Sequence, residues 1–121
     1  MDGARKDYEG PCTWYYRTIA KYVAPPAGQA AIKSYELYSQ TKNTAETLNF
    51  ADLANSPLMV CGDVDHCANK LSGLIEEYGF NELLCWTRIG GLESRKVLRS
   101  MELMSGLVMP RVRKATEKPA A

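Results

Sequence analysis

The sequence predicts an α/β protein whose C-terminal half is a strand–helix–strand–helix (βαβα) unit, preceded by two or three helices. Residues 58–61 and 83–87 are short, wholly apolar runs, which are typical of strands covered on both faces. The residues between them carry an apolar stripe at helical spacing. The connection is long enough for the two strands to lie parallel, with a right-handed crossover.

Size and charge narrow the classes of function. The chain has 121 residues, and its 15 Lys+Arg against 14 Asp+Glu give a net charge of +1. That length fits a single domain. Scattered, balanced charge argues against nucleic-acid binding. No apolar run approaches the roughly 20 residues of a membrane span, and no secretory signal is apparent. We therefore expect a cytoplasmic protein with neither a nucleic-acid nor a membrane partner.

The N-terminal half is predicted to be helical. Apolar residues at helical spacing indicate a helix over 13–23, which Pro25 and Pro26 end because proline cannot continue the ladder. Further helices are expected over 29–41 and 45–54. The chain then divides into a flexible N-terminus at 1–10, a helical segment at 11–56, the βαβα section at 57–114 and a flexible tail at 115–121.

The helices of the C-terminal half have recognisable ends. Asp63 or Asp65 is suited to cap the first of them, and Gly79 is a good C-terminal stop. A last helix is expected over about 93–109, and Pro110 should end or kink it. The stripe of the first helix consists of Cys67, Leu71, Leu74, Ile75 and Tyr78.

Two strands alone are an incomplete sheet. A two-stranded parallel pair leaves both outer edges unpaired, and an isolated pair is marginal in water. The strands are therefore expected to sit beside others, supplied by a second copy or by a larger parallel α/β protein.

Residues 57–113 carry a resemblance. An apolar strand enters Gly62-Asp63, a helix ends in the passage EEYGFNELL, a second strand reaches Gly90-Gly91, and the last helix contains SMEL followed by VMP. This pattern resembles the C-terminal end of the bacterial luciferase-like, flavin-dependent monooxygenases. It covers about half of the chain, and SMEL with VMP is its most specific part.

The resemblance implies a fold and a chemistry. The family fold is a (β/α)₈ TIM-type barrel, in which 58–61 would be the seventh strand and 83–87 the eighth. Such a barrel needs roughly 250 residues, so this chain would supply only its last part. Family members use reduced FMN or F420 and small organic substrates. We expect the isolated chain to be inactive as an oxidoreductase and to bind neither flavin tightly.

A second hypothesis belongs to another class of function. The chain would be a small, non-enzymatic α/β interaction module that forms a homodimer or docks on a partner. Such a module must cover the open sheet edges itself.

The resemblance also implies cofactor-binding residues, because barrel active sites lie at the C-terminal ends of the strands. Gly62, Gly90 and Gly91 would let backbone approach a cofactor, or they simply make tight turns. Arg88 would bind a phosphate or an anionic substrate, or form a surface ion pair. Trp86 would line the flavin pocket or pack in the core. No catalytic residue is predicted.

Metal and thiol chemistry are not expected. His66 is the only histidine, and its surroundings fit no zinc spacing, so we expect it on the solvent side of its helix. Cys12, Cys61, Cys67 and Cys85 are predicted to be reduced, buried thiols, because three of them sit in apolar runs.

Overall fold

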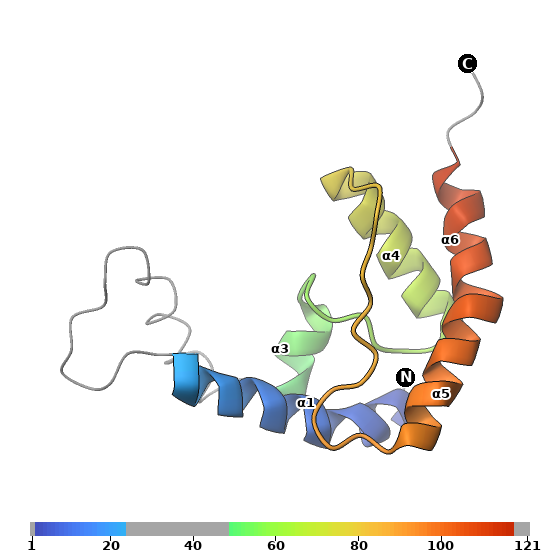
Figure 1. Ribbon diagram of the computed structural model, residues 1–121. Coiled ribbons are helices and arrows are strands. Elements are labelled where there is room, and N and C mark those ends of the chain that lie inside the picture. Colours follow the sequence, from blue (N-terminus) through green and yellow to red (C-terminus); the bar gives the residue numbers. More distant parts are fainter. Residues whose placement is uncertain (1, 24–48, 118–121) are drawn as a thin grey trace, which may run out of the picture.

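The protein is helical throughout the part that the computed structural model describes, residues 2–23 and 49–117 (Figure 1). Helices take up 72% of these residues, and the connections are irregular. No helix within the two ranges has the length and apolarity needed to cross a lipid bilayer. The elements are α1 (Asp2–Val23), α3 (Phe50–Asn55), α4 (Val64–Tyr78), α5 (Ser94–Leu103), the π-helix η2 (Met104–Val108) and α6 (Met109–Thr116).

The predicted strands are absent from residues 2–23 and 49–117, so the βαβα unit and the barrel section are wrong for this part of the chain. Residues 58–61 and 83–87 are non-helical, and no backbone hydrogen bond joins them. Both runs line a common cavity instead. An isolated pair of strands gains little in water, so apolar composition alone does not make a sheet here.

Helix α1 begins at Asp2, well before the predicted start at residue 13, and it passes through Pro11. Arg5 and Glu9 form an ion pair across one turn, with 3.1 Å between Nε and Oε2, which supports the helix locally. Cys12 is only 2% exposed, so packing holds the helix through the proline. The prediction of a flexible N-terminus rests on the polar, glycine-containing composition of residues 1–10, whereas in the structure residues 2–10 belong to α1.

Helix α3 anchors the first of two core clusters. Asn49 accepts a hydrogen bond from the backbone N–H of Asp52 at 3.0 Å and so caps the helix. The first cluster consists of Cys12, Phe50, Leu53, Met59 and Ile89. Helix α3 begins later than the helix predicted over 45–54, because Asn49 is extended and caps it, and it ends one residue later. The helix predicted over 29–41 lies outside the described residues.

Helix α4 confirms both predicted end signals. The Asp63 carboxylate accepts a hydrogen bond from the N–H of His66 at 2.8 Å, and Gly79 adopts a left-handed φ of 66°. The helix packs against η2 and α6, which lie beside it in Figure 1. The second core cluster consists of Cys67, Ala68, Leu71, Val108 and Val112.

Helices α5, η2 and α6 form one continuous rod along the edge of the molecule (Figure 1). Of the two outcomes predicted for Pro110, an end or a kink, the end is wrong, because the helical path continues to Thr116. In the π-helix the N–H of Met109 reaches back to the carbonyl of Met104, which shifts the bonding pattern just before the proline. Pro110 then falls in the first turn of α6, where its missing N–H costs little.

Two long-range contacts join α1 to the C-terminal half. Lys96 Nζ on α5 donates to Asp7 Oδ1 on α1 at 2.6 Å. Gly90 has a φ of 56°, and a Cβ atom there would lie 2.8 Å from the carbonyl oxygen of Pro11. The connection between α4 and α5 therefore needs a glycine where it passes α1.

Candidate functional site

The two core clusters are separated by a cavity of about 550 Å³. Its walls come from α1, residues 57–64, α4, residues 83–89, and the rod formed by α5 and η2. This volume falls in the range of pockets that bind small molecules, roughly 300–1,000 Å³. The lining side chains are mostly apolar, so the cavity favours an apolar ligand or an apolar polypeptide surface.

The π-helix forms part of the wall. Met104 and Val108 line the cavity from η2, and Leu103 lines it from the end of α5. Isolated π-turns are frequent at functional sites, because the extra residue re-aims the side chains on either side of it. This local irregularity is therefore a second indication, after the cavity itself, of a binding surface.

All four cysteines line the cavity, and all are free thiols. Burial, and then a neighbouring thiol, raises the pKa of Cys12 and of Cys61 to about 11. Burial also raises the pKa of Cys67, followed by the negative charge of Asp63. These three thiols therefore stay protonated near neutral pH and are poor nucleophiles. The prediction that all four thiols are buried holds for Cys12 and Cys67, whereas Cys61 is half-buried and Cys85 is exposed.

The polar groups of the cavity are few. The hydroxyl of Tyr8 is buried and has no hydrogen-bond partner among the described residues, so this lining side chain offers an unused donor. Burial, then Cys12, raises the pKa of Tyr16, so that phenol is also neutral. The Asp63 carboxylate lies at the edge, and the hydrogen bond from the His66 N–H lowers its pKa.

No lysine or arginine among the described residues lines the cavity. The ammonium of Lys70 on α4 binds the end of α3 instead. It donates hydrogen bonds to the carbonyls of Ala54 at 2.6 Å and Ser56 at 2.8 Å. Burial lowers the pKa of Lys70. Within residues 2–23 and 49–117, no three metal-ligating side chains come together.

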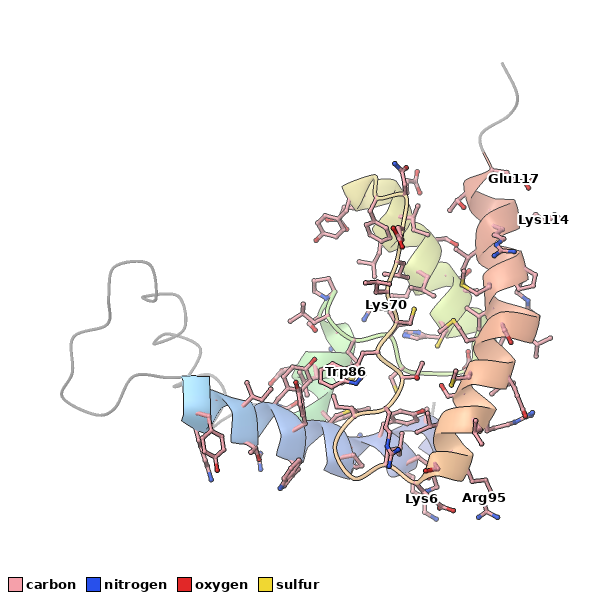
Figure 2. The ribbon with its side chains drawn as sticks, in the orientation of Figure 1. Lys6, Lys70, Trp86, Arg95, Lys114 and Glu117 are labelled. Atoms are coloured by element: carbon pink, nitrogen blue, oxygen red, sulfur yellow. The ribbon has the colours of Figure 1, made fainter. Side chains whose placement is uncertain are left out.

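Two of the five predicted cofactor-binding residues lie at the cavity. Gly62 is packed against His66, because a Cβ on this glycine would lie 2.7 Å from the ring. Trp86 meets the edge of Tyr15 with ring centroids 4.9 Å apart, and Figure 2 shows it over α1. The His66 ring also differs from the expectation of a solvent-facing side chain, since its Nε2 atom is buried.

The other three predicted residues lie away from the cavity. Arg88 is exposed, with no hydrogen bond or ion pair to any described residue. Gly90 is used for the close approach to Pro11. Gly91 lines a separate, shallow hollow with Pro11 and Trp14. The structure therefore does not bring the five residues together into one site.

Sequence reasoning missed the wall that α1 provides. Tyr8, Cys12 and Tyr16 all line the cavity, at positions i, i+4 and i+8 of one helix. This stripe is visible in the sequence, but it begins at residue 8, before the predicted start of the first helix at residue 13.

Comparisons with protein-family models, curated protein sequences and solved structures found no match for the chain.

Proposed function

We propose that the chain is the C-terminal part of a luciferase-like, flavin-dependent oxidoreductase and that it does not turn over a substrate by itself. The proposal rests on the sequence pattern of residues 57–113 and on one structural observation. The same span supplies most of the wall of an apolar cavity of about 550 Å³. Most of the residues that line the candidate site thus lie within the span that resembles the family, and the others come from α1.

The cavity suits the ring system of a flavin but not its phosphate group. A flat aromatic ring system fits an apolar cavity of this size, and the unpartnered hydroxyl of Tyr8 offers it a hydrogen-bond donor. A phosphate does not fit, because the described lining contains the Asp63 carboxylate and no cation. When bound, a reduced flavin supplies electrons for oxygen activation or hydride transfer. The chain's own residues contribute a water-poor surface with neutral thiols.

Binding of the flavin ring can be followed through Trp86. A Trp14→Phe variant leaves Trp86 as the only tryptophan, and lumiflavin, which has the ring without a phosphate, is then titrated into it. We expect saturable quenching, with FMN binding no more tightly than lumiflavin because its phosphate finds no cation. The matched control is the free compound N-acetyltryptophanamide, titrated in the same way, which reports only collisions and light absorption.

Two results would overturn the proposal. Quenching of the variant that is unsaturable and equal to that of the free tryptophan compound would exclude the cavity as a flavin-ring site. Oxygen uptake with reduced FMN that exceeds the buffer control would show that the isolated chain is active, contrary to the second part of the proposal.

The second candidate function is a non-enzymatic interaction module. The sequence predicted an α/β module, but the described residues make it a helical one. The observation that favours it is the exposure of large apolar side chains between α4 and α5, where Leu84 is 89% exposed and Trp86 is 68% exposed. Exposed apolar groups gathered in one segment are typical of interaction surfaces.

We further propose that the protein works in the cytoplasm. Four free thiols around one cavity suit a reducing compartment, where disulfides are rare. Fractionation of cells that express a tagged chain tests this, and recovery outside the cytosolic fraction would contradict it.

A further inference from the structure

Residues 82–88 form the most exposed apolar segment of the described chain. Figure 1 shows the connection from α4 to α5 as a long, drawn-out trace, and this segment is its central part. Leu83 is 39% exposed, Leu84 is 89% exposed, and Cys85 is exposed as well. Figure 2 places Trp86, at 68% exposure, in the middle of the same trace. Trp86 contacts Tyr15 and the segment lines the cavity, but much of the apolar surface of these side chains stays open to solvent.

The backbone of the same segment is also without partners. None of the N–H or C=O groups of residues 82–88 forms a hydrogen bond with another described residue. A row of free donors and acceptors in a non-helical segment is a template for pairing with a strand. An exposed apolar surface alone would bind many kinds of partner. Unpaired backbone N–H and C=O groups favour an extended polypeptide, because it can form hydrogen bonds with each of them.

The charged residues at the two ends of the segment favour a second copy of the same segment as the partner. Glu82 begins the segment and Arg88 ends it, and both side chains are exposed. Neither forms an ion pair with a described residue. The segment thus carries a negative charge at one end, a positive charge at the other, and apolar residues between them. Such a segment is complementary to itself when its direction is reversed.

We propose that the protein forms a homodimer in which residues 82–88 of two copies pair antiparallel about a two-fold axis at Cys85. Glu82 of each copy then lies opposite Arg88 of the other, which gives two equivalent ion pairs. Leu84 lies opposite Trp86 of the second copy on the same face. A two-fold interface of this kind uses one surface patch twice, as closed dimers do.

The alternative pairing directions are disfavoured by the same charges. A parallel, in-register pair places Glu82 beside Glu82 and Arg88 beside Arg88, and like charges directly opposite each other are destabilising. A shift of one residue in the antiparallel pair separates both ion pairs and moves the side chains to opposite faces. The ends of the segment therefore specify both direction and register.

Sedimentation velocity of the full chain over a range of concentrations tests the charges. We expect a concentration-dependent dimer. Glu82→Arg or Arg88→Glu alone should weaken it by about tenfold, because each change opposes like charges twice across the axis. The double variant Glu82→Arg/Arg88→Glu exchanges the two ends and should restore the dimer. Loss of folding does not explain such a rescue.

Cys85 tests the register directly. Residues opposite each other in an antiparallel pair have Cα atoms about 4.5 or 5.5 Å apart, which falls within the range of disulfides. Diamide, a thiol oxidant, should therefore link two copies through Cys85, with two thiols oxidised and diamide reduced to the hydrazine. The dimer should be visible on a non-reducing gel, and Cys85→Ser should abolish it.

A matched control separates this contact from random collision. Cys85→Ser/Asn69→Cys moves the exposed thiol to an exposed position on α4 and keeps the number of thiols unchanged. We expect this variant to cross-link at least tenfold more slowly than the unaltered chain. Equal rates would mean that Cys85 is not at a two-fold axis.

Other outcomes overturn the proposal as well. A monomer at all concentrations excludes the dimer, and a dimer insensitive to Glu82 and Arg88 uses another surface. None of these measurements involves flavin. They therefore test the dimer independently of the proposed oxidoreductase role.

Discussion

Helix α4 and residues 82–88 are both apolar, yet they end in opposite environments. In α4 the side chain of Leu71 is 2% exposed and packs in the cluster with Val108 and Val112. In the segment after α4, Leu84 is 89% exposed and its backbone has no hydrogen-bond partner among the described residues.

The difference lies in what each backbone requires. A helix satisfies its own hydrogen bonds and needs cover on one face only, which η2 and α6 provide. A strand that is apolar on both faces needs two covers and a neighbour at each edge. The described residues provide the single covering face that α4 needs. They do not provide the two covering faces and two neighbouring strands that residues 83–87 would need as a strand.

The largest expected effect comes from the packed region. Leu71→Ala removes a fully packed side chain and should lower the free energy of unfolding by about 2–5 kcal/mol. Leu84→Ala removes the same atoms from an exposed site and should change it by less than about 0.5 kcal/mol in dilute monomer. Denaturant unfolding at low protein concentration measures both, and similar losses would show that the segment is covered in solution.

Two neighbouring glycines, just after residues 82–88, test how tightly the connection between α4 and α5 packs against α1. Gly90→Ala should cost about 1–3 kcal/mol, since the residue has a left-handed φ and its Cβ would meet the carbonyl of Pro11. Gly91→Ala has open space around it and serves as the control. Thermal melts of the two variants should differ clearly. Equal melting temperatures would mean that the connection does not pass α1 as described.

Lys70 provides a smaller effect on the packed side. Lys70→Met keeps the length of the side chain and removes its bonds to the carbonyls of Ala54 and Ser56, which should cost about 1 kcal/mol. Lys114→Met, at an exposed position near the end of α6, should be close to neutral. Urea unfolding midpoints provide the measurement, and a neutral Lys70→Met would exclude a role for the ammonium in holding the end of α3.

The smallest effect is a pH dependence at the start of α4. The hydrogen bond from the His66 N–H lowers the pKa of Asp63 below its ordinary 3.8, so this group stabilises the folded state above its unfolded pKa. That contribution is lost as the pH falls through the lowered pKa. Asp63→Asn keeps a capping oxygen that does not titrate. Its stability should therefore fall less than that of the unaltered chain between about pH 6 and about pH 2.5, as followed by circular dichroism.

Sequence patterns predicted the features that depend on neighbouring residues. The Asp63 cap, the Gly79 stop and the buried positions Cys67 and Leu71 all follow from spacing within one helix. The strands at 58–61 and 83–87 failed because pairing depends on residues far away, which no local pattern reports.

The candidate site divides in the same way. Gly62 and Trp86 were predicted and lie at the cavity, whereas Arg88, Gly90 and Gly91 were assigned through a strand-end geometry that is absent from the described residues. The contribution of α1 was missed because the first helix was predicted to begin at residue 13, whereas it begins at Asp2.

The contact between Asp7 and Lys96 also has a consequence for synthesis. These two residues are 89 positions apart, and Ile89 must likewise arrive before the cluster around Cys12 can close. At translation rates of about 5–20 residues per second, Asp7 is made roughly 4–18 seconds before Lys96, so α1 leaves the ribosome well before its contacts with the C-terminal half can form. During that interval its apolar stripe has only the nascent chain and chaperones to contact, so slowed translation should increase chaperone capture of this helix before any other part of the protein.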